Sequence, residues 1–170
     1  FSFVLLKLFL LNQKEDSHIL TIEDPVEFVH TSQRALVNQR EVKRDTRSFN
    51  AALKSALRED PDCILVGEMR DLETIRLALE AAETGHLVLG TLHTMSAIKT
   101  VDRVISVFPP AEQELVRNML AESLQIVISQ RLLKRKGGGR VAGYEVLISN
   151  TGIRNMIKEN KLSQIYTALQ

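Results

Sequence analysis

The most reactive group of side chains follows a short apolar run in the first half of the chain. Residues 63–66 read CILV between a nearby proline and a glycine, which is typical of a buried strand in a parallel sheet. An acid, a base and a second acid come next: Glu68, Arg70 and Asp71. A carboxylate at the carboxyl end of such a strand can hold Mg²⁺ through water or activate water for attack on a phosphate. The structural alternative makes Asp71 the N-cap of a following helix.

Two other apolar runs, residues 19–22 and 87–89, also lead into polar residues. The carboxyl ends of parallel strands share one sheet edge, so we expect one crevice there to be lined by Glu23, Glu27, Glu68 and His93. Crowded carboxylates repel one another unless a cation is present, and the set therefore predicts a magnesium–nucleotide site. The alternatives are that Glu23 and the following Asp-Pro form only a turn, and that the histidine is satisfied in the core or at a cap.

Basic residues supply the complementary charge. They surround a predicted helix: Arg40, Lys43, Arg44, Arg47 and Arg58. Most such runs are solvated surface, but arginine suits bidentate phosphate contact and neutralises charge in phosphoryl transfer. No GxxxxGK(S/T) loop occurs in the chain, so the backbone amides and lysine of that phosphate cradle are missing. The residues alone indicate part of a nucleotide-dependent enzyme.

Strands and helices are predicted to alternate along the chain. Strands are expected at 19–23, 62–67 and 87–92, and helices at 3–13, 49–57, 72–84, 97–107, 111–124, 151–159 and 163–169. Segments 27–30 and 35–40 are consistent with a hairpin or an edge pair, and segments 126–136 and 141–148 flank three glycines and predict a hairpin. Strands separated by helices indicate βαβ units, an α/β fold and a parallel core sheet.

Composition narrows the function classes. The 170 residues are 44% apolar and 25% charged with a net charge of +1, an ordinary globular balance that gives no argument for nucleic-acid binding. The single cysteine, Cys63, excludes an internal disulfide and a Cys-only zinc site, and its buried strand indicates a small core residue. Residues 1–11 are apolar except for Ser2 and Lys7. They are too short to span a bilayer, lack signal-peptide features, and are typical of a buried helix cut off at its start.

Three long segments, in order, resemble site motifs of the secretion-ATPase superfamily that powers type IV pili and type II secretion. ILTIEDPVEF at 19–28 resembles its aspartate box, DPDCILVGEMRD at 60–71 its Walker B strand, and GHLVLGTLHT at 85–94 its histidine box. The resemblance implies a RecA-like P-loop NTPase core, ATP and Mg²⁺ as cofactors, and hydrolysis coupled to mechanical work. It also implies the site residues: Glu68 polarising water, Glu23 and Glu27 with Glu68 holding Mg²⁺ through water, His93 sensing the γ-phosphate, and Arg44 and Arg58 as arginine fingers.

The resemblance also implies an assembly and a division of the chain. Family members are homohexamers at the cytoplasmic face of the inner membrane, docked on a pilus platform protein, and we expect no nucleic acid, no transmembrane segment and no zinc. Residues 1–150 would be a truncated core, and residues 151–170 the start of a C-terminal helical region. The family's Walker A lysine would fall just before residue 1, so we expect the N-terminal P-loop unit to be missing and this fragment alone to be inactive.

The branch of the family is indicated by two features. Extension and secretion members carry a four-cysteine zinc insertion where this chain has only glycines at 137–139, which favours the retraction branch. GIRNMIKE at 152–159 resembles a retraction signature, and its spacing predicts an apolar face of Ile153, Met156 and Ile157 packed on the core, with outward-facing Arg154, Asn155, Lys158 and Glu159. The alternatives are an extension or type II secretion motor, or a non-catalytic module.

Overall fold

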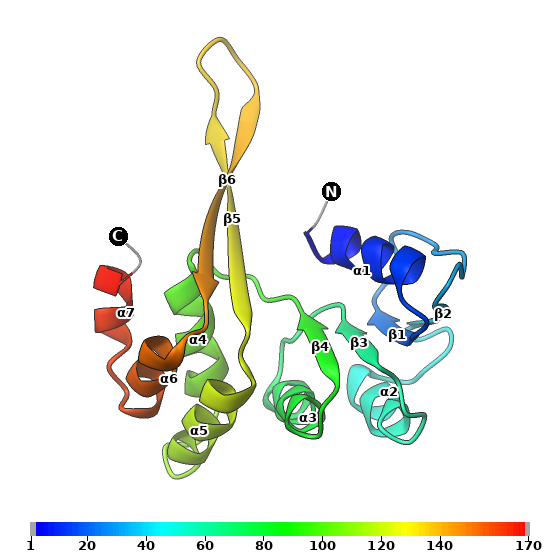
Figure 1. The fold of residues 1–170 in the computed structure, drawn as a ribbon, viewed down its shortest axis with the longest axis horizontal. Coiled ribbons are helices and arrows are strands. Elements are labelled where there is room, and N and C mark those ends of the chain that lie inside the picture. The colour runs from blue at the N-terminus through cyan, green and yellow to red at the C-terminus, as the bar shows by residue number, and fades with distance from the viewer. Residues whose placement is uncertain (1–2, 169–170) are drawn as a thin grey trace. The chain divides into compact units, whose positions relative to one another are not determined.

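The computed structural model describes residues 3–168 and separates into two compact units, Phe1–Leu92 and His93–Gln170 (Figure 1). The first unit contains a four-stranded sheet in the order β2-β1-β3-β4, and the second contains a two-stranded sheet. The mixed α/β class, the parallel sheet, the late hairpin and the C-terminal helices confirm the fold predicted from the sequence.

All four strands of the first unit run parallel. They are β1 (His18–Glu23), β2 (Leu36–Glu41), β3 (Cys63–Val66) and β4 (Leu87–Gly90). Strand β1 lies between β2 and β3, with Ile22 opposite Val66 of β3 and opposite Arg40 of β2. Every residue of β3 is buried, as its unbroken apolar run predicts for a strand covered on both faces.

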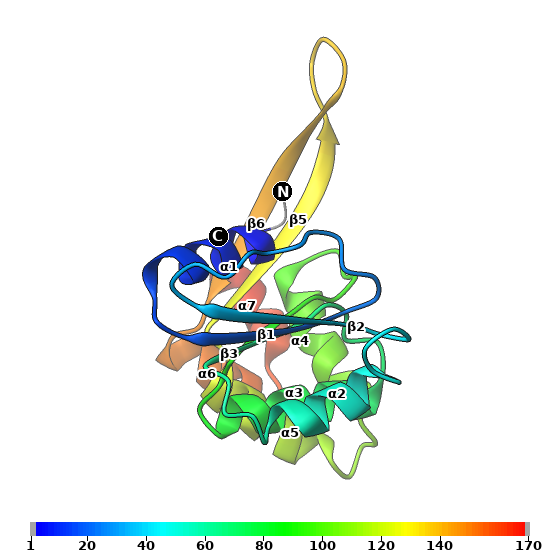
Figure 2. The ribbon, with the colours of Figure 1, turned by 90° about the vertical axis from the view of Figure 1, so that its right-hand side faces the viewer.

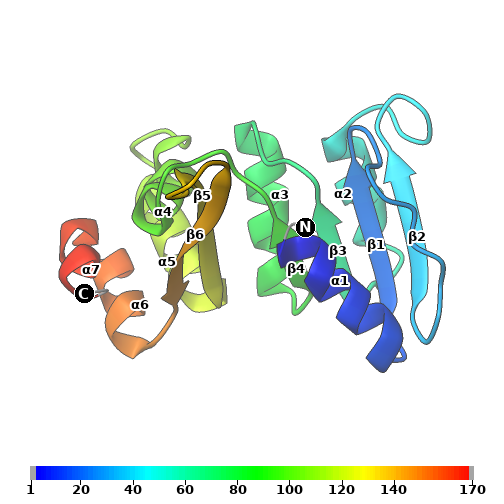
Figure 3. The same cartoon turned by 90° about the horizontal axis from the view of Figure 1, so that it is seen from above.

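Helices cover both faces of this sheet (Figure 3). On one face, α2 (Phe49–Ala56) and α3 (Leu72–Glu83) pack Leu53 and Leu77 against Leu20 and Val66. On the other, α1 (Phe3–Lys14) packs Leu8 and Leu11 against the sheet. The first helix thus supplies core residues, although part of its surface, including Phe9, stays exposed.

Segment 27–30, predicted as half of a hairpin or edge pair, is not a strand, and β2 instead pairs in parallel with β1 as the outer strand of the sheet. The chain between them, residues 24–35, is a connection held by side chains of β2, such as Gln39, which accepts a hydrogen bond from the backbone N–H of His30 at 2.7 Å. Parallel neighbours need a longer connection than a hairpin turn, which explains why this segment does not pair.

Helix starts follow the predicted capping chemistry. Asp71 Oδ1 accepts the Thr74 backbone N–H at 2.9 Å, so the structural reading of Asp71 as the N-cap of α3 is confirmed. Ser96 caps α4 (Ala97–Ser106) in the same way, because its Oγ accepts a hydrogen bond from the Lys99 N–H. The α3 helix ends just before Gly85, whose φ of +100° suits a glycine stop.

The second unit joins helices to one long hairpin. It contains α4, α5 (Gln113–Ser123), α6 (Thr151–Lys158) and α7 (Leu162–Ala168), and the antiparallel strands β5 (Ile126–Lys134) and β6 (Arg140–Ile148). The hairpin extends well beyond the helices of its own unit (Figures 1 and 2). Position 169 of the last predicted helix lies outside the described residues.

The α6 helix confirms its predicted orientation except at one polar position. Ile153 and Ile157 are buried, as predicted, and Met156 is half-buried. The prediction that Arg154 projects outward is wrong, because its Nη1 donates to the carbonyl oxygens of Ala121 at 2.7 Å and Glu122 at 2.5 Å. A long side chain that leaves from the polar edge of one helix reaches the carbonyls at the end of another.

Within residues 3–168, no helix combines the length and the apolar character needed to cross a bilayer.

Candidate active site at the carboxyl edge of the parallel sheet

Glu23 and Glu68 are brought to one sheet edge by the register of two strands. Ile22 of β1 lies opposite Val66 of β3, so Glu23 and the Gly67-Glu68 turn leave the sheet side by side. The Gly67 N–H continues the ladder by donating to Ile22 O at 2.8 Å. A Cβ at Gly67 would come within 2.9 Å of that same oxygen, so glycine permits the close approach of the two strand ends.

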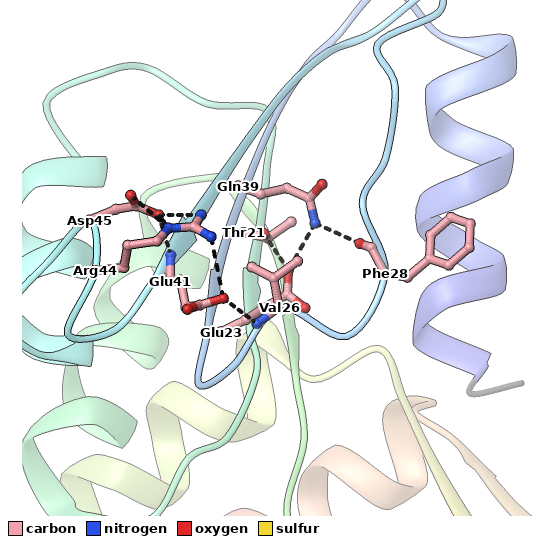
Figure 4. A network of polar contacts seen from close by, with 8 residues as sticks. All are labelled: Thr21, Glu23, Val26, Phe28, Gln39, Glu41, Arg44 and Asp45. Atoms are coloured by element: carbon pink, nitrogen blue, oxygen red, sulfur yellow. Dashed lines mark hydrogen bonds and ion pairs between the residues drawn. The ribbon is translucent and has the colours of Figure 1, made fainter.

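The carboxylate of Glu23 is held by two neutral donors (Figure 4). It is only 7% exposed, and its Oε1 accepts from Thr21 Oγ1 at 2.6 Å and from Gln39 Nε2 at 3.1 Å. Both bonds end on the same oxygen, and Oε2 has no hydrogen bond to any described residue. Glu23 is therefore anchored through one oxygen while the other stays available to a ligand.

Gln39 also holds the chain that carries Glu27. Its Nε2 donates to Phe28 O at 2.9 Å, and its Oε1 accepts from His30 N. Nearby, the Val26 N–H donates to Glu41 Oε2 at 3.1 Å (Figure 4). Glu27 itself is exposed and lies on this connection rather than on a strand. Sequence reasoning missed Gln39, although an amide on a strand beside the motif acids was a usable signal.

Glu68 lies in the turn that follows β3. Its carboxylate, with a side chain 20% exposed, pairs with the Arg70 guanidinium at 2.5 Å. The hydrogen bond and charge of Glu68 raise the pKa of Arg70 above its ordinary value. Glu68 thus stands next to a cation of its own turn, two residues after the end of β3, while Glu23 ends the neighbouring strand β1.

The Glu68 turn is also attached to the end of β4. The Met69 N–H donates to Thr91 O at 3.0 Å, and the Thr91 hydroxyl donates to Gly67 O. The Met69 side chain covers Gly90, where an added Cβ would lie 2.5 Å from the methionine Cε. Backbone bonds on both sides therefore fix the direction in which Glu68 leaves the sheet.

His93 is exposed and begins the second unit, whereas Glu23, Glu27 and Glu68 belong to the first. It follows β4 by three residues, because this strand ends at Gly90 and not at the predicted residue 92. Its place in a common site with the three glutamates stays a prediction.

The two predicted arginine fingers differ in their surroundings. Arg44 pairs with Asp45 at 2.8 Å and lies 3.6 Å from Glu41, and hydrogen bonding to Asp45 raises the pKa of Arg44. Arg58 is exposed and makes no ion pair with any described residue. Arg40 is bound to both carboxylate oxygens of Glu59 at 2.7 Å, which makes it a structural contact between β2 and the end of the α2 segment.

The described residues offer no direct metal cage. Among residues 3–168, no group of three His, Cys, Asp or Glu side chains is arranged to hold a metal ion. The donor set at the sheet edge, two carboxylates with Glu23 Oε2 unengaged, nevertheless fits Mg²⁺ held through its water shell, because Mg²⁺ keeps several waters and takes few protein ligands. Burial raises the pKa of the Cys63 thiol to about 12, which suits a core residue and not a nucleophile.

Comparisons with known proteins show what the whole chain is similar to. The family model described as "Type II/IV secretion system protein" matches residues 2–137. The chain is 68% identical over 160 residues to the type IV pilus retraction ATPase PilT of Pseudomonas aeruginosa, covering 94% of this chain and 46% of that protein. It is 64% identical over 161 residues to a twitching motility protein of Neisseria gonorrhoeae, covering 94% of this chain and 43% of that protein.

The fold is similar to a solved structure as well. The crystal structure of the pilus retraction motor PilT with bound ADP superposes with a TM-score of 0.92 at 59% identity, covering 96% of this chain and 48% of the other. The chain spans about half the length of the curated relatives it matches. With a family match over most of its residues and the family's fold, this chain belongs to the type II/IV secretion system protein family.

Proposed function

We propose that this chain is part of an ATP-hydrolysing hexameric motor that powers type IV pilus retraction and twitching motility. The observation that carries the proposal is the in-register pairing of β1 and β3, which sets Glu23 and Glu68 at one sheet edge. The similarity to retraction and twitching proteins over 94% of the chain supports the choice of process.

In this proposal the two glutamates have different tasks. Glu68 polarises the water that attacks the γ-phosphate, because its carboxylate leaves the sheet where ligands of α/β folds bind. Glu23, anchored through Oε1, would hold the water shell of Mg²⁺ through Oε2, and Glu27 would add a second carboxylate from the following connection. ATP with Mg²⁺ supplies the phosphoryl group when bound.

His93 and the arginines complete the proposed site. His93 senses the γ-phosphate and passes its state to the second unit, which it begins. Arg44 and Arg58 neutralise the transferring phosphoryl group across a subunit interface. Arg58 has no ion pair with a described residue to break before it binds a phosphate. Arg44 must first leave its ion pairs with Asp45 and Glu41.

The chain supplies only some of the groups that this chemistry needs. No GxxxxGK(S/T) loop is present, so the amides and lysine that cradle the phosphates must come from a longer protein. We therefore expect no substantial ATP turnover by the 170-residue chain alone. The same observation favours a second candidate, a non-catalytic module of the same ring.

The proposed assembly is a homohexamer at the cytoplasmic face of the inner membrane, meeting a pilus platform protein. Residues 1–150 would belong to the ATPase core and residues 151–170 to a C-terminal helical region. The absence of cysteines around the 137–139 glycines supports retraction over the extension or secretion branches.

The test uses a longer parent that carries a phosphate loop. Glu68→Gln should lower ATP turnover by roughly 10²–10⁴-fold and leave nucleotide binding largely intact, because the amide keeps size but removes the base. Glu73→Gln is the matched control, since Glu73 lies in the first turn of α3 and pairs with Lys54. Turnover within about threefold of the wild type in Glu68→Gln would move the catalytic role elsewhere, and a parent without any turnover would favour the module.

A further inference from the structure

The tip of the β5–β6 hairpin carries a concentrated positive charge. Residues 131–140 are all exposed and include no acidic residue. Half of them are basic: Arg131, Lys134, Arg135, Lys136 and Arg140. Figures 1 and 2 show this tip projecting away from the helices of its own unit, so the charges lie on a narrow, accessible end.

The turn at the tip is closed tightly by glycines. The φ angles of Gly137, Gly138 and Gly139 are +95°, +103° and +78°. These are left-handed backbone conformations, which residues with a side chain rarely adopt. The Arg135 N–H donates to Gly139 O at 3.1 Å, which closes the loop. The basic residues therefore extend from a compact turn and not from a long, shapeless loop.

The positive charges at the tip are not compensated within the described chain. Lys134 and Arg140 are the last paired residues of the ladder and lie directly opposite each other. Like charges in that position destabilise a hairpin. Lys134, Arg135, Lys136 and Arg140 make no ion pair with any of residues 3–168. Arg131 differs from these four residues, because its Nε donates a hydrogen bond to the carbonyl oxygen of Met95 at 2.7 Å.

Exposed aliphatic side chains lie beside these charges. Leu132 is 58% exposed, Leu133 52% and Val141 50%. Leu133 and Val141 are cross-strand partners, so they form one small apolar surface just behind the basic turn. Basic side chains next to aliphatic ones are typical of segments that lie in the interface of an anionic bilayer.

We propose that this basic tip, residues 131–141, binds the surface of an anionic phospholipid bilayer. The cations meet the lipid headgroups, and Leu132, Leu133 and Val141 enter the boundary with the acyl chains. This proposal rests on the membrane location given under the proposed function and names the part of the chain that would contact the bilayer. It does not depend on ATP hydrolysis, so lipid binding and ATPase activity can each fail without the other.

A bilayer fits the tip better than two other partners. Binding to single-stranded nucleic acid relies on aromatic side chains for base stacking, and residues 131–141 contain none. A stable protein interface uses about 20–30 residues on each side, more than this tip presents. A structural alternative is that the charges only prevent edge-to-edge pairing of the hairpin, which predicts no lipid binding.

The experiment measures binding of the whole 170-residue chain to sedimenting vesicles. Vesicles of phosphatidylcholine with phosphatidylglycerol should retain the chain, in a salt-sensitive manner, and pure phosphatidylcholine should not. The triple change Lys134→Gln, Arg135→Gln and Lys136→Gln should weaken binding by at least about tenfold. The matched control changes three exposed cations elsewhere, Lys14, Lys99 and Arg103, to Gln and should bind nearly as the wild type.

A fluorescence probe tests the depth of insertion separately. The chain has no tryptophan, so Leu133→Trp places a single reporter at an exposed position of the tip. Its emission should shift to the blue, and brominated lipids should quench it, with anionic vesicles only.

Four outcomes would overturn the proposal. In the first two, the chain does not bind anionic vesicles, or the tip triple variant binds them as tightly as the wild type. In the other two, the control triple variant loses as much binding as the tip variant, or the Leu133→Trp emission does not shift with anionic vesicles. Tip-dependent binding to duplex DNA, to RNA or to polyglutamate that is tighter at the same salt concentration would assign the tip to that partner instead. Circular dichroism of each variant verifies folding, which is expected because the altered side chains are exposed.

Discussion

Arg154 Nη1 lies 2.7 Å from the carbonyl oxygen of Ala121, and this hydrogen bond ties α6 to the C-terminal end of α5. The same guanidinium reaches Glu122 O at 2.5 Å and Leu124 O at 3.3 Å. Carbonyls in the last turn of a helix have no partner within the helix, and a cation there also meets the negative end of the helix dipole. Arg154 therefore acts as a C-terminal cap supplied by a different helix.

The first prediction follows from this cap. Arg154→Ala should lower the free energy of unfolding by about 1.5–3 kcal/mol, because it removes hydrogen bonds from a charged group to half-buried carbonyls. Lys158→Ala is the control on the same helix. Its ion pair with Glu122 is solvent-exposed, and such pairs add little stability. Chemical denaturation of both variants measures the difference, and equal stabilities would show that the cap is dispensable.

A buried residue on the apolar face of α6 provides a reference for the stability cost of Arg154→Ala. Ile157 is fully buried, and Ile157→Ala should cost roughly 2–5 kcal/mol through lost burial and a cavity. If Arg154→Ala lowers the free energy of unfolding by a comparable amount, then segment 152–159 stabilises the fold through Arg154 as well as through its apolar face. Asn155 and Glu159 are exposed and would then be better candidates for a surface that acts in motility.

A second prediction concerns pH and the N-cap of α3. Burial raises the pKa of the Asp71 carboxyl, but hydrogen bonds from Thr74 and Asn50 outweigh it and hold the pKa below its ordinary value. A lowered pKa in the folded state stabilises the protein above the unfolded pKa, near 3.9, and this stabilisation is lost as the pH falls through the folded value. Stability should therefore drop on acidification partly through Asp71.

Two substitutions separate the charge of Asp71 from its cap. Asp71→Ala should cost about 1 kcal/mol at pH 7, whereas Asp71→Asn keeps a good capping side chain and should cost less. The difference between the wild type and Asp71→Asn should shrink as the pH approaches 3, because only the carboxylate titrates. Unfolding curves from pH 3 to pH 7 measure it, and a difference that does not change with pH would contradict the assignment.

Parts of this architecture could be predicted from local patterns, and others could not. The buried strands were recognisable because β1 and β3 are covered on both faces and so carry apolar runs, and the caps because Asp71 and Ser96 act on residues three positions away. The pairing of β2 with β1 depends on contacts between distant segments, which no local pattern shows. For the same reason helical spacing placed Arg154 outward, since spacing does not reveal which carbonyls its side chain can reach.

A third prediction tests the close approach of β1 and β3. Gly67→Ala places a Cβ within 2.9 Å of Ile22 O, a backbone atom that cannot move without shifting the strand. We expect a loss of about 1–3 kcal/mol in stability and, in a longer active parent, reduced turnover. Gly90→Ala is the contrast, because its Cβ would meet the flexible end of Met69, which can turn aside. Thermal unfolding should rank Gly67→Ala clearly below Gly90→Ala, and the reverse order would show that β4 and not β1 restricts the turn.

The fourth prediction concerns Gln39 and rests on the proposed ATPase activity. Gln39 Nε2 donates both to Glu23 Oε1 and to Phe28 O, so one amide fixes the carboxylate and the connection that carries Glu27. Without it Glu23 keeps only the Thr21 bond, and its carboxylate can rotate out of the orientation in which the proposed Mg²⁺ would be held. Gln39 is thus a positioning residue and not a catalytic one.

In a longer parent with a phosphate loop, Gln39→Ala should lower kcat by roughly tenfold or more and change KM for ATP little. The reason is that small displacements of catalytic side chains slow the reaction strongly. Asn38→Ala, one position earlier on β2 with its amide on His18 instead, is the matched control and should keep normal turnover. The Mg²⁺ concentration for half-maximal activity should rise in Gln39→Ala alone, a change that a general loss of stability would not produce. If kcat falls equally in both variants, β2 matters only as a strand, and if the Mg²⁺ requirement is unchanged, Glu23 is positioned without Gln39.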